Sequence, residues 1–156
     1  MTQSSHSVYD KEKGKLFGCL ASGEDLLAGL IAQCEVHGIT SGFVTCMGSL
    51  SQVCYIHGAS DAQGKPTYSQ EKEVVGAIEL LSGTGVIAKD ESGELDIHFH
   101  GLIVNEDGTI LGGHFLKNKN PVLVTIEFCI HVSDNVEAKR AFNEKAGFRL
   151  TTFNQK

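Results

Sequence analysis

The spacing of apolar residues along the chain predicts one strong helix. Between Ser22 and Gly38, leucine, isoleucine and cysteine side chains recur every three or four positions, as on one buried face of a helix. Ser22 is the predicted N-cap, with Asp25 three residues later in a capping-box arrangement, and Gly38 is the predicted stop. One face of this helix is therefore expected to pack on a sheet.

Most of the remaining chain has a sequence pattern typical of β-strands. Predicted strands occupy KLFGCLASG from Lys15, two segments separated at Gly48, short stretches at 78–81 and 85–87, and VLVTIEFCIHV. The segment DNVEAKRAFNEKAG is predicted to be a second, minor helix, and FRLTTF a closing strand. The expected fold class is α+β, a mostly antiparallel sheet with one major helix and one minor helix packed on it.

The length of the chain predicts a single domain over 1–156. Its expected parts are a flexible head over 1–14, a core over about 15–132, and the C-terminal helix and strand over 133–156.

Composition narrows the function classes. The net charge of −6 comes without a basic cluster, so nucleic-acid binding is not expected from this chain alone. Five cysteines, an odd number without CxxC spacing, predict buried, reduced thiols. The polar N-terminus shows no apolar signal segment, and no apolar run approaches the ~20 residues of a membrane span, so a cytoplasmic protein is expected.

Three of the seven histidines lie in one apolar hairpin, HFHGLIVNEDGTILGGHF. His98 and His100 share a face, because alternate residues of a strand point the same way. A three-residue loop over 106–108, with Gly108 in the left-handed conformation, would place His114 directly opposite His100. A two-residue turn at 107–108 would instead place Phe115 there, and a bulge at the two glycines before His114 would change the register again.

In the first register the hairpin is apolar on both faces. Leu102, Val104, Ile110 and Leu116 share the histidine face, whereas Phe99 and Phe115 lie on the other. One face can pack on the helices, and we expect a neighbouring subunit to cover the other, which predicts a homo-oligomer.

Three converging imidazoles predict a metal site formed by His98, His100 and His114, with zinc the first candidate. Three protein ligands leave a fourth position for water, an anion or a residue of another subunit. In an enzyme, Glu79 or Glu127 could move a proton beside metal-bound water, although each also fits a structural role. Purely structural histidines are the remaining interpretation.

Several motifs resemble the plant-and-prokaryote-conserved (PPC) domain. The resemblance runs from about Leu16 to Val132, through GEDLLAGLIAQCEVHGI, CMGSLSQV, AIELLSGTGVI and the histidine hairpin. It implies an α+β homotrimer with His98, His100 and His114 near a subunit boundary where zinc binds, and an acidic residue at the position of Glu79.

The family's DNA-binding label belongs largely to plant members, which carry a basic AT-hook with an Arg-Gly-Arg-Pro core. This sequence contains no such stretch, and a trimer would carry a charge of about −18, which repels phosphate. The expected function is a trimeric, zinc-binding PPC-type module with an unidentified small ligand or protein partner. A metal-dependent enzyme is the alternative.

Overall fold

The computed structural model describes residues 4–156, which form eleven strands and one helix. The elements in chain order are β1 (His6–Asp10), β2 (Lys15–Ala21), α1 (Leu26–Val36), β3 (Gly42–Ile56), β4 (Gly58–Ser60), β5 (Pro66–Tyr68), β6 (Lys72–Lys89), β7 (Leu95–Val104), β8 (Ile110–Phe115), β9 (Val122–Val132), β10 (Val136–Asn143) and β11 (Phe148–Gln155). Within these residues, no helix has the length and apolar character needed to cross a membrane.

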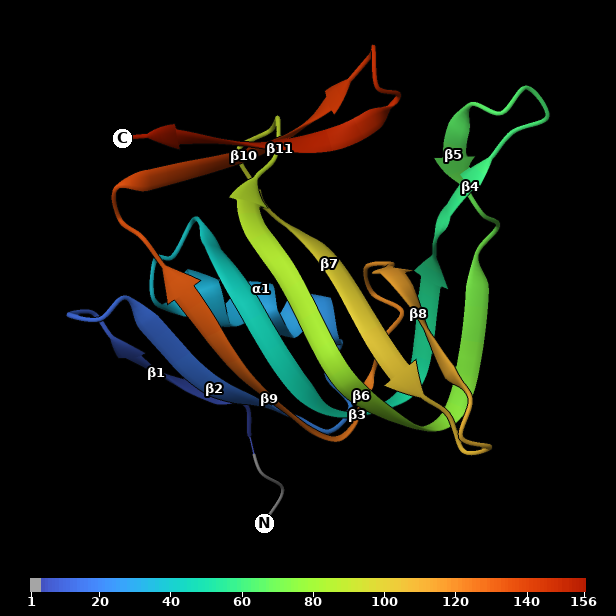
Figure 1. Cartoon of the computed structure of the whole chain (residues 1–156). Coiled ribbons are helices and arrows are strands. Elements are labelled where there is room, and N and C mark those ends of the chain that lie inside the picture. Colours follow the sequence, from blue (N-terminus) through green and yellow to red (C-terminus); the bar gives the residue numbers. More distant parts are fainter. Residues whose placement is uncertain (1–3) are drawn as a thin grey trace.

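Nine strands form one large sheet in the order β1-β2-β9-β3-β8-β7-β6-β10-β11, with β3 also paired to β6. The additional pairing closes β3, β6, β7 and β8 into a ring at one end of the sheet. Strands β4 and β5 form a separate small hairpin beside this ring (Figure 1). The sheet is therefore strongly curved, and it encloses the apolar side chains on its inner face.

Helix α1 lies behind the large sheet (Figure 1) and contacts β2 and β7. Its buried residues Leu26, Leu27, Leu30 and Cys34 join a core that includes Phe99 and Phe115. Four of the five cysteines are buried, as predicted, and burial raises the pKa of Cys34 to about 12. The helix is confirmed, and it covers the inner face of the sheet.

The minor helix predicted over 134–147 is wrong. This segment contains strand β10, which pairs with β11 from Val136↔Gln155 to Asn143↔Phe148. Along β10, Ala138 and Arg140 are buried whereas Lys139 between them is exposed, which is the two-residue period of a strand. The arginine was not recognised as a buried position, so the alternation was missed.

Three smaller predictions also change. Residues His6–Asp10, in the head that was expected to be flexible, pair with β2 as strand β1. The two segments separated at Gly48 are one long strand, β3, whose register with β6 shifts between Cys46 and Gly48. The stretches at 78–81 and 85–87 are likewise parts of the single strand β6.

The N-cap of α1 is Asp25 and not Ser22. One carboxylate oxygen of Asp25 accepts hydrogen bonds from the backbone N–H groups of Leu27 and Ala28, both at 3.0 Å. Its second oxygen accepts from the N–H of Asn120 at 2.8 Å. The Ser22 hydroxyl instead donates to the carbonyl of Leu123. The cap thus ties the helix to the segment that leads into β9.

Replacing the cap tests this assignment. Asp25→Ala is expected to lower the free energy of unfolding by about 1–2 kcal/mol, because three backbone donors lose their acceptor. Ser22→Ala, the matched control, is expected to change it by about 0.5 kcal/mol or less. Urea denaturation followed by circular dichroism measures both, and equal losses would contradict the assignment.

Candidate metal centre

The loop between β7 and β8 fixes the register of the histidine hairpin. Asn105 and Thr109 flank the loop, with the Asn105 N–H donating to the Thr109 carbonyl at 3.2 Å. Gly108 has φ of +82°, the left-handed conformation that the three-residue loop requires. The Thr109 N–H also donates to the side chains of Asn105 and Asp107, both at 2.9 Å. The predicted loop is confirmed.

This register places His100 directly opposite His114, without a bulge at the two glycines. Gly112 allows the close approach, because a Cβ there would lie 2.2 Å from the carbonyl oxygen of Gly101 on β7. The two strands therefore bring the histidines together through backbone geometry.

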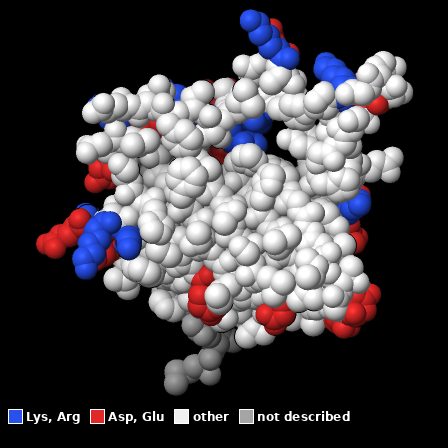
Figure 2. Space-filling model, in the orientation of Figure 1, with Lys and Arg blue, Asp and Glu red and all other residues white. Residues whose placement is uncertain are grey.

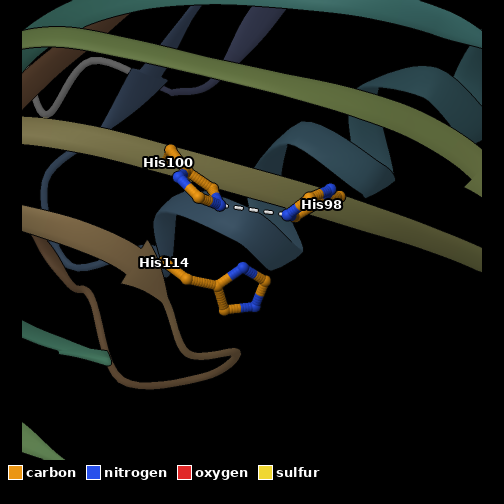
Figure 3. Close-up of side chains that lie close together, drawn as sticks. All are labelled: His98, His100 and His114. Carbon is orange, nitrogen blue, oxygen red and sulfur yellow. Dashed lines mark hydrogen bonds between the residues drawn. The ribbon is translucent and has the colours of Figure 1, made fainter. Parts of the chain in front are cut away.

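The three imidazole rings form one compact cluster. Each offers a ring nitrogen, and these nitrogens all lie within 4.8 Å of one another. The Nε2 atoms of His98 and His100 are 3.0 Å apart. In Figure 3 the His114 ring turns the nitrogen bonded to Cγ, Nδ1, toward the other two rings. This Nδ1 is buried and has no hydrogen-bond partner among the described residues.

The cluster lies on the outer face of the sheet, opposite α1. Phe99 and Phe115 point inward, so the parity predicted for the hairpin is confirmed. His98 and His114 are half-buried and His100 is exposed. Two open hollows of about 400 and 320 Å³ flank His100, and residues of β6 line both. A small ligand can therefore approach the cluster from the outer face.

Burial keeps the histidines neutral. It lowers the pKa of His98 and of His114 to about 4, and the positive charge of Arg140 acts in the same direction. The pKa of His100 is lowered by the same two causes. Neutral imidazole is the form that binds a metal ion, so this environment favours the protonation state that a metal site requires.

Three charged residues beside the cluster were not identified from the sequence. Asp96 precedes His98 by two residues on β7 and shares its face. One oxygen of Asp96 lies 3.2 Å from Nε of Arg140 on β10, and the other lies 2.5 Å from Nζ of Lys117. Strand parity would have placed Asp96 beside His98, but Arg140 had been assigned to a helix.

The structure does not bring the two glutamates to the histidines within one chain. Glu79, on β6, pairs with Val104, which lies roughly 13 Å along β7 from His100. Glu127, on β9, pairs with Cys19 and Met47, and its carboxylate lies 3.9 Å from the Cys19 sulfur. The group of side chains among the described residues that could hold a metal ion consists of the three histidines.

A family model described as the Plants and Prokaryotes Conserved domain matches residues 9–134. The chain belongs to this family. The match covers the whole histidine hairpin and ends before β10 and β11, so Arg140 lies outside the matched PPC region. No curated protein matches the chain.

Solved structures share the fold of this PPC protein. A candidate DNA-binding protein from Bacteroides thetaiotaomicron is 19% identical, with a TM-score of 0.79 over 97% of this chain and 99% of its own. A PPC protein from Pyrococcus horikoshii is 23% identical, with a TM-score of 0.72 over 100% of this chain and 99% of its own. A metal-containing protein from Archaeoglobus fulgidus is 21% identical, with a TM-score of 0.72 over 97% of this chain and 95% of its own. These likenesses establish the fold.

The lowered pKa values predict how stability depends on pH. The histidines of the unfolded chain take up protons near the ordinary pKa of 6.5, whereas His98 and His114 in the folded protein do so near 4. The metal-free protein is therefore expected to lose stability as the pH falls from about 6.5 toward 4. The His114→Gln variant is expected to lose less stability than the wild type over this pH interval.

Urea midpoints measured in EDTA between pH 7 and pH 4 test this prediction. His6→Gln is the matched control, because His6 is exposed and lies on β1. It is expected to follow the wild-type pH dependence. The prediction fails if the His114→Gln and wild-type curves have the same slope.

Proposed function

We propose that this PPC domain binds one divalent metal ion, with zinc as the first candidate, through His98, His100 and His114. The observation that carries the proposal is the convergence of their three ring nitrogens within 4.8 Å. Zn–N bonds of about 2.0–2.1 Å in tetrahedral geometry require nitrogens about 3.4 Å apart, so the rings need only small rotations. The unpaired Nδ1 of His114, which faces the other two rings, is the third ligand atom.

The relation to the Archaeoglobus protein supports metal binding. That protein is described as metal-containing, and its fold covers 97% of this chain. Zinc is preferred here because three neutral imidazoles without a thiolate or carboxylate suit it well. The ion would link β7 to β8, and its fourth position would face the outer hollows.

We infer a binding or regulatory role in preference to catalysis. A general base must reach metal-bound water within hydrogen-bond distance, directly or through one water molecule. Within one chain, neither Glu79 nor Glu127 lies in the cluster. Both carboxylate oxygens of Asp96 are engaged in ion pairs, one with Arg140 and the other with Lys117, so this side chain is not available as that base.

The proposal includes a homotrimer. Large apolar side chains are exposed on the outer face of the sheet, including Phe17, Phe43, Met47, Leu81 and Leu102. Figure 2 shows that the broad centre of this face is almost free of charged side chains, which lie mostly around its rim. Covering such a face with two further copies removes the apolar surface from water. The PPC resemblance favours three copies over two.

A cytoplasmic location is also part of the proposal, since five largely buried cysteines suit a reducing compartment. DNA binding is not included. The centre of the outer face, almost free of charged side chains, and the net charge of −6 supply no attraction for the DNA backbone.

Metal content tests the central proposal. Protein purified without added metal is expected to contain about one equivalent of zinc per chain by elemental analysis. His100→Ala and His114→Ala are expected to lose it, whereas His57→Ala, an exposed histidine on another segment, retains it. Zinc at 100 times its Kd is expected to stabilise EDTA-treated wild type by about 2.7 kcal/mol. The proposal would be refuted if the wild type contained no stoichiometric metal, or if His100→Ala and His114→Ala retained it.

The mass in solution tests the assembly. Light scattering is expected to give about 50 kDa, three times the chain mass of 16.7 kDa. Met47→Asp places a charge on the outer face at a side chain that is 60% exposed, and is expected to yield monomers. Val36→Asp is the control, because Val36 is 73% exposed on α1 behind the sheet. A monomeric wild type, or a trimeric Met47→Asp, contradicts the assembly.

A further inference from the structure

The hairpin formed by β10 and β11 contributes a buried cation to the surroundings of the histidine cluster. Arg140 is 6% exposed, and its Nε lies 3.2 Å from Asp96 Oδ2. Asp96 is itself 5% exposed and shares a strand face with His98, only two residues away. The guanidinium is therefore held at the edge of the metal centre, where its charge lowers the pKa of all three histidines.

The charges around the cluster do not balance once a metal is bound. Asp96 is the one carboxylate among the described residues whose negative charge acts on His98 and His114. It already pairs with two cations, Arg140 and Lys117. A divalent ion held by three neutral imidazoles would therefore face a surplus of positive charge in a half-buried site. Such a site favours a negatively charged fourth ligand.

Unsatisfied polar atoms lie in the same region. The buried side-chain atoms without a hydrogen-bond partner among the described residues are Nδ1 of His114, Nη1 of Arg140 and Oγ1 of Thr151. Arg140 and Thr151 are directly opposite each other on β10 and β11, so their side chains share a face. Buried groups of this kind are normally paired, and an anionic oxygen would satisfy an N–H and an O–H donor.

We propose that the ligand of the metal centre is a small carboxylate, bound at the metal's fourth position and held there by the charge of Arg140. This inference rests on the proposed metal site and adds the chemical class of its ligand. Tyr68 supplies an aromatic wall, since its ring centroid lies 6.1 Å from that of His114 and 5.0 Å from that of Phe148. Arg140 is thus a ligand-binding residue supplied from outside the matched PPC region.

The test uses the full-length protein loaded with Co²⁺, whose visible absorption reports on changes in coordination. Titration with acetate is expected to shift the spectrum in a saturable way, whereas uncharged acetamide gives no shift at the same concentrations. A parallel titration of the Co²⁺-loaded protein uses inorganic phosphate. Tighter binding of phosphate than of acetate would overturn the carboxylate assignment in favour of a phosphate-type anion.

Arg140→Gln is expected to weaken acetate binding by about tenfold or more, because a charge-assisted contact is lost. The same variant is expected to bind Co²⁺ as tightly as wild type or more tightly, because a repelling positive charge has been removed. A purely structural role for Arg140 would weaken metal and acetate binding together, so this opposite response separates the two roles.

Two further variants control for folding and for general charge. Arg140→Lys keeps the buried cation and is expected to retain most of the acetate affinity. Lys139→Gln removes the same charge from the adjacent residue of β10, where the side chain is 56% exposed and paired with Glu137. It is expected to bind acetate like wild type.

The outcomes distinguish this inference from the proposed function. If wild type binds no Co²⁺ and the histidine variants behave like it, the metal site itself fails and the carboxylate site fails with it. If wild type binds Co²⁺ but acetate leaves the spectrum unchanged, only the ligand class is overturned. The role of Arg140 is overturned if Arg140→Gln and wild type bind acetate equally.

Discussion

The backbone pairing of β7 with β8 is the constraint on which the rest of the site depends. A loop closed by Gly108 sets the register, and the absence of a side chain at Gly112 lets the strands meet without a bulge. In that register His114 faces His100, and alternation along β7 adds His98. A shift by one residue would turn His114 to the inner face and Phe115 outward, which would dismantle both the cluster and the core at once.

The surroundings of the cluster come from parts of the chain far away in sequence. Asp96 lies near the start of β7, Lys117 follows β8, and Arg140 lies on β10, yet the three form one ion-paired group. Buried charges of this kind require partners, so the pair between Asp96 and Arg140 also fixes where the C-terminal hairpin sits. The same contact therefore contributes both to the position of that hairpin and to the electrostatics of the histidines.

The sequence predicted the elements that depend on local signals. The apolar period of α1, the loop at Gly108 and the face shared by His98 and His100 are all set by neighbouring residues, and the structure confirms them. Strand β10 was mistaken for a helix, because one of its buried positions is Arg140, whose burial depends on a carboxylate 44 residues earlier. Helix capping was misassigned for a similar reason, since Asp25 also binds the distant Asn120. In both cases, interactions between residues far apart in the sequence determined the structure, and the local pattern did not reveal them.

The ring formed by β3, β6, β7 and β8 closes at a narrow seam. The ladder between β3 and β8 has two residue pairs, Tyr55↔Phe115 and Ile56↔His114, and the second contains a member of the histidine cluster. A ring closed by so short a ladder opens there more readily than along its long pairings, because fewer hydrogen bonds must break. A cation bound by His114 and by the two histidines of β7 would resist that opening from the outside. Transient opening of the ring between β3 and β8 and dissociation of the bound cation would then be coupled.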